Sequence, residues 1–143
     1  MHTISREEYA KAVIACVHLA HLRTGGSRVA AQVLLSAYNG DDFQLDVSDL
    51  CNLDRTNFEN AMMVIRGRYE TSLDPHSVVE NGSKIFHDLW DKWGWLQVVE
   101  RGKRDCPVCG GRGAVYINPD DDEDLPSEPC THCSGTGRVC RCV

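Results

Sequence analysis

The chain has 143 residues, a length that suits one compact domain with a small appendage and is too short for two full-sized domains. Its 15 basic and 21 acidic side chains give a formal net charge of −6, which argues against non-specific binding to nucleic acid or to an anionic membrane. Hydrophobic residues make up 42%, too many for a disordered chain, and no apolar run is long enough for a transmembrane helix. The acidic pair Glu7-Glu8 stands where a secretory signal would be apolar, so we expect a cytoplasmic protein.

Residues 1–105 are predicted to form a mainly α domain of about four helices. Ser5 and Glu8 have the spacing of a capping box at the start of the first helix, which Gly25-Gly26 is expected to end. Ser27 is the expected cap of the second helix, and Asn39-Gly40 is expected to stop it through left-handed backbone. The apolar residues at helical spacing are Tyr9, Val13, Cys16, Val17 and Ala20 in the first helix and Val29, Val33, Leu34 and Ala37 in the second.

The rest of the helical domain contains two further predicted helices. Residues 41–53 are expected to be a loop with a short helical turn from Val47, after which Asp54 caps a helix whose apolar face is formed by Phe58, Met62, Ile65 and Tyr69. Asp74-Pro75 opens one long helix, kinked at Asn81-Gly82 and ended by Gly94. The weak alternation of residues 95–99 predicts a strand, and residues 101–104 a turn.

The cysteines provide the most specific signal in the sequence. Residues 106–113 read CPVCGGRG and residues 130–137 read CTHCSGTG, so both fit C-x-x-C-x-G-x-G. Two thiolates separated by two residues can hold one tetrahedral ion from a tight turn, and glycine supplies the positive φ that the following backbone needs. The predicted metal ligands are Cys106, Cys109, Cys130 and Cys133, which together would close a structural zinc site. Spacing alone leaves iron open, and His132 is expected to be exposed rather than a ligand.

Residues 106–143 are therefore predicted to be a zinc-bound β-hairpin, a two-stranded ribbon held at one end by the metal. Its strands are expected at 114–117 and 138–140, on either side of a mobile acidic loop that contains Asp120, Asp121, Asp122, Glu123 and Asp124. Cys140 and Cys142 have three interpretations: alternative zinc ligands, a second site shared between chains, or exposed thiols at a frayed end. The last is favoured, because two thiolates alone rarely fix a tetrahedral ion.

Several other polar and aromatic residues were weighed as functional sites. His18 and His21 lie three apart on the first helix but lack a third ligand, so they are interpreted as a partly buried or surface pair. Cys16 and Cys51 lack a base and are interpreted as small core residues. The basic residues Arg66, Arg68, Arg101, Lys103 and Arg104 are interpreted as solvated turns rather than a phosphate-binding patch. The tryptophans Trp90, Trp93 and Trp95 are interpreted as a core seam with the zinc hairpin, with a partner-binding hot spot as the alternative.

The pair of cysteine repeats resembles the zinc hairpin of DnaJ-type chaperones, which carry four such repeats and bind two ions. The two repeats of this chain imply one ion, and the J-domain signature His-Pro-Asp is absent. A zinc hairpin with two repeats and one ion resembles the hairpins of lambdoid Q antiterminators and of the anti-TRAP inhibitor. The helical segments LLSAYNGDDFQLDVSDLCNLD and ENGSKIFHDLWDKWGW resemble an uncharacterised family from phages and mobile elements of proteobacteria.

No nucleotide-binding loop, catalytic triad or open metal site is evident, so we predict no catalytic residues and a protein that is not an enzyme. The expected function is that of a zinc-binding interaction protein, a phage or mobile-element regulator or inhibitor that binds a host protein complex of defence or transcription. In this hypothesis the acidic run could occupy a basic channel of the partner. The alternative is an antiterminator-like regulator that binds nucleic acid through residues 101–104, Arg112, Arg138 and Arg141, which the net charge disfavours.

Overall fold

The computed structural model describes residues 2–101, 103–116 and 127–140. The chain divides into two compact units, Met1–Val98 and Val99–Val143, each of which is described by itself. The fold is mainly helical with small antiparallel strands near the cysteines, as predicted. The domain boundary that the sequence places after residue 105 stays a prediction.

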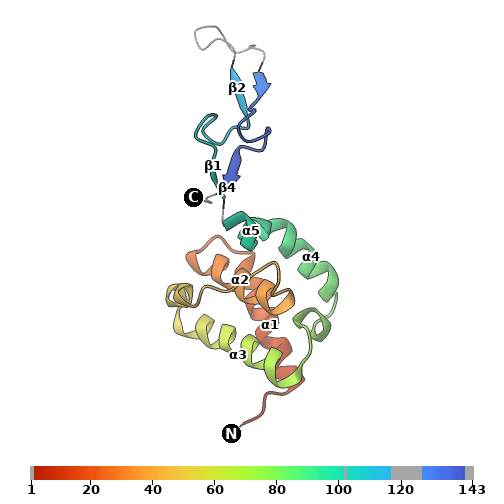
Figure 1. Ribbon diagram of the computed structural model, residues 1–143. Helices are drawn as coiled ribbons and strands as arrows, with labels where there is room; N and C mark the ends of the chain where they lie inside the picture. The colour runs from red at the N-terminus through yellow and green to blue at the C-terminus, as the bar shows by residue number, and fades with distance from the viewer. Residues whose placement is uncertain (1, 102, 117–126, 141–143) are drawn as a thin grey trace. The chain divides into compact units, whose positions relative to one another are not determined.

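The first unit contains four long helices joined by loops and short 3-10 turns (Figure 1). In chain order these elements are α1 (Arg6–Ala20), α2 (Gly25–Tyr38), the 3-10 helix η1 (Val47–Asn52), α3 (Arg55–Thr71), the 3-10 helix η2 (Pro75–Val78), α4 (Gly82–Trp93) and the 3-10 helix η3 (Gly94–Leu96). A single turn, α5 (Val98–Arg101), follows. Within the described residues, no helix combines the length and the apolar character needed to cross a bilayer.

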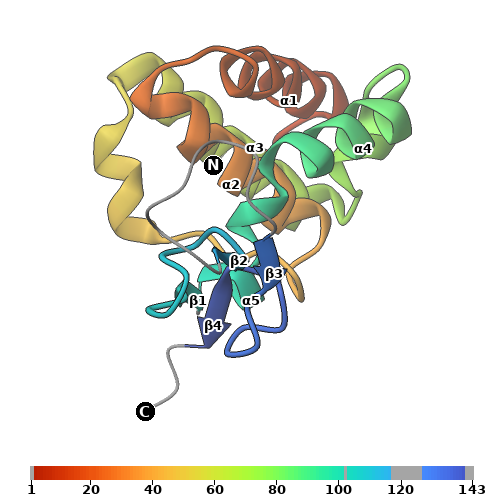
Figure 2. The ribbon, with the colours of Figure 1, turned by 90° about the horizontal axis from the view of Figure 1, so that it is seen from above.

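The first helix is central to the core of this unit, because α1 packs against both α2 and α3 (Figure 2). Tyr9, Val13 and Cys16 of α1 are buried in one cluster with residues of α2 and α3. A Cβ built on Gly67 of α3 would lie 2.3 Å from the ring of Tyr9, so only glycine allows this close approach of the two helices. The Tyr9 hydroxyl donates a hydrogen bond to the carbonyl oxygen of Leu73 at 3.1 Å, and burial raises the pKa of Tyr9 to about 12.

The cap of α1 is the capping box that the sequence predicts. The Ser5 hydroxyl accepts a hydrogen bond from the Glu8 amide at 3.1 Å, and the Glu8 carboxylate accepts one from the Ser5 amide at 2.8 Å. The Ser5 amide, together with the His2 side chain, lowers the pKa of Glu8 to about 2. The predicted cap of α3 is confirmed as well, because the Asp54 carboxylate accepts from the Asn57 amide at 2.8 Å.

The residues that cap the two ends of α2, and the way in which they do so, differ from the prediction. The N-cap is Thr24, so that Gly25 and Gly26 open α2 instead of ending α1, and the buried Ser27 accepts a hydrogen bond from the Thr24 amide. The helix does end before Asn39, but the backbone of Asn39 is extended, with φ −145°, rather than left-handed. The Asn39 side-chain oxygen instead accepts the amides of Asp41 and Asp42, so a side-chain turn replaces the expected left-handed stop.

The buried face of α3 is also different from the predicted one. Phe58 and Tyr69 are exposed, whereas Ala61, Val64 and Gly67 are buried. The small residues lie toward α1 because the two helices approach closely there, and the larger side chains therefore turn outward. The predicted face was wrong for Phe58 and Tyr69, whereas Ile65 packs against the core as predicted.

Two further sequence predictions fail between residues 74 and 99. The single kinked helix is in fact η2 followed by α4, with Asn81 in the left-handed conformation between them at φ 55°. A Cβ on Gly82 would lie 1.7 Å from the His76 carbonyl oxygen, so the chain folds back on itself at this point and cannot continue as one helix. Residues 95–99 form no strand, because they belong to η3, to the start of α5 and to the residue between them.

In its described residues, the second unit contains two short antiparallel sheets rather than one ribbon. Strand β1 (Lys103–Asp105) pairs with β4 (Arg138–Cys140), and β2 (Ala114–Tyr116) pairs with β3 (Ser127–Pro129). The segments between β1 and β2 and between β3 and β4 hold the cysteine repeats, so the cluster has strands on both sides instead of closing one end. The acidic run at 120–124 and the tail at 141–143 lie outside the described residues.

Candidate metal centre

The four predicted ligand cysteines lie together, and all four side chains are buried. Their sulfur atoms lie within 4.8 Å of one another, and the Sγ atoms are 3.8 Å apart both in the pair Cys106 and Cys130 and in the pair Cys109 and Cys133. A regular tetrahedron with metal–sulfur bonds of about 2.3 Å has sulfur–sulfur edges of about 3.8 Å. A disulfide would need about 2.05 Å between sulfurs. The arrangement therefore fits a tetrahedral ion held by four thiolates.

The two repeats fold into equivalent turns, here called knuckles, at residues 106–113 and 130–137. In the first knuckle the Gly113 amide donates to the Cys109 sulfur at 3.2 Å, and in the second the Gly137 amide donates to the Cys133 sulfur at 3.1 Å. Both glycines have positive φ, of 78° and 77°. The last glycine of each repeat thus aims a backbone N–H at a thiolate, which offsets part of the sulfur charge.

Each knuckle also hydrogen-bonds to the other. The Cys106 amide donates to the Gly137 carbonyl oxygen at 2.9 Å, and the Cys130 amide donates to the Gly113 carbonyl oxygen at 2.9 Å. The first cysteine of each repeat is therefore fixed by the last glycine of the opposite repeat.

The close approach of the knuckles leaves no room for a side chain on these glycines. A Cβ on Gly113 would lie 2.5 Å from the Gly135 carbonyl oxygen, and a Cβ on Gly137 would lie 2.4 Å from the Gly111 carbonyl oxygen. The sequence predicted that these positions need glycine for their φ. It did not reveal the second reason, the contact between the two knuckles.

The ionisation of the thiols reflects two opposing effects. Burial raises the pKa of Cys133, but the Gly137 amide and the neighbouring cysteines outweigh it and lower the pKa to about 7. The pKa of Cys109 is lowered as well, because the amides of Gly113 and Gly111 oppose the effect of burial, whereas burial dominates at Cys106 and raises its pKa. Thiolate is the form that binds a metal, so the backbone amides prepare two of the sulfurs for a cation.

A family profile described as a family of unknown function, DUF7673, matches residues 10–94. The chain belongs to the DUF7673 family. A search of curated proteins and a search of solved structures each found no match. The region that matches DUF7673 lies within the helical unit and ends before the cysteine cluster, so the family assignment describes the helices and leaves the metal centre to be argued from its own geometry.

The remaining cysteines and histidines of this DUF7673 protein do not join the cluster. Cys16 is buried, as predicted, and burial raises its pKa to about 12, but Cys51 is exposed, so its assignment to the core was wrong. His18, His21 and His132 are exposed. Among the described residues, the four cysteines are the only group of three or more metal-ligating side chains that lie close together. All three interpretations of Cys140 and Cys142 stay predictions, because the side chain of Cys140 and all of Cys142 lie outside the described part.

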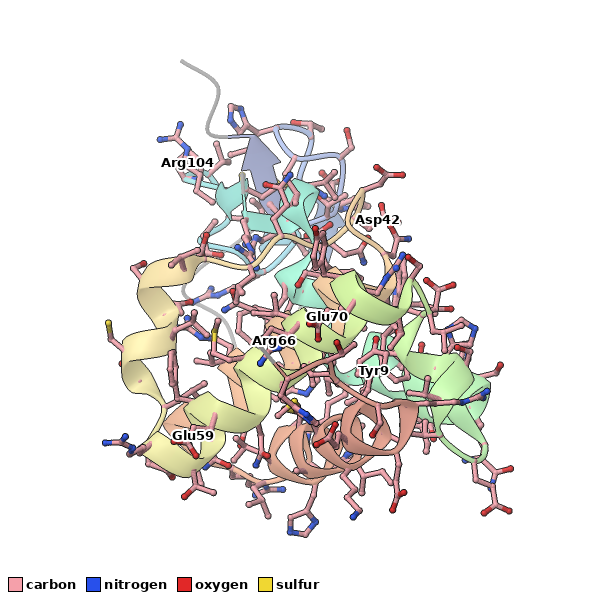
Figure 3. All side chains as sticks on the ribbon, turned by 90° about the horizontal axis from the view of Figure 1, so that it is seen from below. Tyr9, Asp42, Glu59, Arg66, Glu70 and Arg104 are labelled. Carbon is pink, nitrogen blue, oxygen red and sulfur yellow. The ribbon has the colours of Figure 1, made fainter. Side chains whose placement is uncertain are left out.

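Three of the five basic residues considered as a phosphate site have carboxylate partners. Arg66 pairs with Glu70 at 3.2 Å on α3 (Figure 3), and Lys103 pairs with Glu100 at 2.9 Å. Arg68 pairs with a carboxylate of the loop after α3 at 3.2 Å. These pairs agree with the interpretation of the basic residues as ordinary surface charges.

The three tryptophans have different environments. Trp90 and Trp93 are partly buried against the core of the helical unit, whereas Trp95 is 55% exposed, with its ring centroid 5.8 Å from that of Trp93. Whether Trp95 contributes to a binding surface stays a prediction.

Proposed function

We propose that Cys106, Cys109, Cys130 and Cys133 hold one structural Zn²⁺, and that the protein acts by contact with a partner protein rather than by catalysing a reaction. The observation that supports the metal is the set of buried sulfurs with 3.8 Å edges, which fits a tetrathiolate ion. Zinc is the usual ion of closed all-cysteine sites that stabilise small folds. An ion held by four thiolates has no position left for water or substrate, which favours a structural role over a catalytic one.

The contact role is supported by the exposed apolar side chains of both units. Val108 at the tip of the first knuckle is 59% exposed, and Val99 and Trp95 are also more exposed than buried. Exposed large apolar side chains are common at protein interfaces, although single ones occur on most surfaces. On this proposal the partner is a host protein complex that the protein regulates or inhibits, and the acidic balance of the chain favours a basic surface on that partner.

Metal analysis of purified protein tests the zinc site directly. We expect one zinc per chain for the wild type and for Cys51→Ser, whose thiol is exposed and lies outside the cluster. Cys109→Ser should lose most of the metal. Stoichiometric iron would replace zinc in the proposal, and wild-type protein without stoichiometric metal, from cells grown with added zinc, would overturn it.

Capture of partners with the same variants tests the contact role. A partner that is retained by wild type and by Cys51→Ser, but released by Cys109→Ser, would require the folded knuckles. A gel-shift assay tests the antiterminator-like alternative with the same proteins. Binding of a nucleic acid by wild type and by Cys51→Ser, together with its loss in Cys109→Ser, would favour that alternative. Specific turnover of a substrate that survives in Cys51→Ser and disappears in Cys109→Ser would contradict the non-enzymatic role.

A further inference from the structure

The helical unit has a hollow of about 600 Å³ that the cysteine cluster does not involve. It lies at the end of α2, and it is lined by Tyr38, the turn at residues 39–41, Asp74, His76 and Trp90. The hollow is a shallow depression that is largely open to solvent rather than an enclosed cavity. All of these residues fall inside the segment that matches DUF7673.

Aromatic rings set at steep angles to one another form the walls. The ring centroid of Tyr38 is 5.1 Å from that of His76 and 6.5 Å from that of Trp90, with an angle of 86° between the planes in both pairs. Behind these rings lie two buried phenylalanines, Phe86 at 5.2 Å from Tyr38 and Phe43 at 4.8 Å from Trp90. The walls are therefore fixed by the core and are present before any ligand arrives.

The charged residues that line the hollow are both acidic, and one of them is paired with an arginine that lies outside the lining. Asp41 and Asp74 contribute carboxylates, and no lysine or arginine is among the lining residues. Asp74 is paired with Arg68 at 3.2 Å, but Asp41 is exposed and makes no ion pair within the described part of the chain. The faces of aromatic rings are also electrostatically negative. Aromatic rings together with the Asp41 carboxylate therefore favour a cation over an anion.

We propose that this hollow binds an organic ammonium group carried on a short alkyl stem. The rings would contact the ammonium and its stem, and the Asp41 carboxylate would supply the opposite charge at the rim. Such a group occurs both in small alkylamines and in lysine side chains, so the test includes one probe of each kind. The inference is independent of the metal centre, because every lining residue belongs to the helical unit.

The test uses two pairs of probes, and NMR of the full-length, isotope-labelled protein measures the binding of each probe. Choline is compared with its uncharged analogue 3,3-dimethylbutan-1-ol, and Nα-acetyl-lysine amide with the uncharged Nα-acetyl-norleucine amide. We expect at least one of the two cations to shift the NMR resonances of the Trp90 indole N–H and of the Tyr38 and Asp41 amides, with a saturable dose dependence. Its uncharged analogue should leave these resonances unchanged. The cation that binds more tightly identifies the source. No saturable shift with either cation, or equal shifts with an uncharged analogue, would overturn the proposal.

Matched charge variants then locate the bound cation. Asp41→Asn should weaken the binding of the cation about threefold to fivefold, because it removes the unpaired carboxylate at the rim. Glu59→Gln removes the same charge from an exposed position on α3 outside the hollow, and it should leave the affinity unchanged. Equal affinity in both variants would contradict the assigned site. The amide spectra of both variants report whether the fold is retained.

Discussion

Replacing Gly137 by alanine should weaken zinc binding, and it should do so more than the same replacement of Gly135, the other glycine of the second knuckle. Gly137 has φ 77°, and a left-handed conformation costs an L-residue about 1–2 kcal/mol. The new Cβ would also lie 2.4 Å from the Gly111 carbonyl oxygen, closer than the 3.0 Å that Cβ atoms keep, and relieving such an overlap costs about 1–3 kcal/mol. The combined effect is about 3 kcal/mol, which corresponds to a loss of zinc affinity of about a hundredfold.

The matched control is Gly110→Asn in the first knuckle. Gly110 also has positive φ, 62°, but no atom lies within 4 Å of the position that its Cβ would take. Asparagine tolerates left-handed backbone, and Ser134 already occupies the equivalent place in the second knuckle with φ 54°. We therefore expect Gly110→Asn to retain zinc affinity within about threefold. Competition with a colorimetric zinc chelator, under reducing conditions at fixed pH, measures both variants.

A double variant separates contact between the knuckles from local strain. Gly113→Ala should resemble Gly137→Ala, because its Cβ would meet the other knuckle in the same way. Since the two substitutions disturb one shared contact, their combined effect should be smaller than the sum of the separate effects. The reasoning is refuted if Gly137→Ala binds zinc as well as Gly110→Asn does, or if the two alanine substitutions are fully additive.

Three predictions concern the helical unit, and each is measured by the helical circular dichroism signal during denaturation. Gly82→Ala should destabilise the unit by about 3 kcal/mol or more, because its Cβ would lie 1.7 Å from the His76 carbonyl oxygen; a change below about 0.5 kcal/mol in the urea midpoint would contradict the close approach. Tyr9→Phe should cost about 1 kcal/mol, since it removes the hydrogen bond to the Leu73 carbonyl oxygen; an unchanged midpoint would show that this bond contributes nothing. The pKa of Glu8 is about 2 in the fold, below its ordinary value of 4.5, so its contribution to stability is complete above pH 4.5 and is lost as the pH falls toward 2. In Glu8→Gln the stability should therefore change less across that range, and an identical acid dependence would exclude this carboxylate as a cause.

Local sequence signals predicted the helix ends correctly where one side chain does the capping. Ser5 with Glu8, and Asp54, cap their helices because the hydrogen bonds involve residues only three apart in the chain. The same reasoning placed the short helical turn at Val47 and the end of α4 before Gly94. These features depend on neighbours in the sequence, so a single sequence contains the information to predict them.

The failed predictions for α3 and for the start of α4 depend on steric contacts that local periodicity does not display, whether the two residues are distant in the chain, as Tyr9 and Gly67 are, or near, as His76 and Gly82 are. The buried face of α3 is set by how closely Gly67 lets Tyr9 approach, and the break before α4 is set by the His76 carbonyl oxygen against Gly82. Neither contact leaves a periodic signal, and the exposed Phe58 and Tyr69 gave a misleading one. At such points tertiary packing overrides local preference.

The cysteine cluster combines both kinds of information. The repeated spacing predicted which four sulfurs would lie together, but it did not predict that each knuckle is completed by the other. The pairs of sulfurs at 3.8 Å join residues 24 apart, and the amides of Cys106 and Cys130 each bond across to the opposite repeat. Neither repeat can therefore form its full set of hydrogen bonds alone. A cation bound to all four thiolates would stabilise this mutual contact as well as its own coordination, so metal binding and folding of the two knuckles would be one equilibrium.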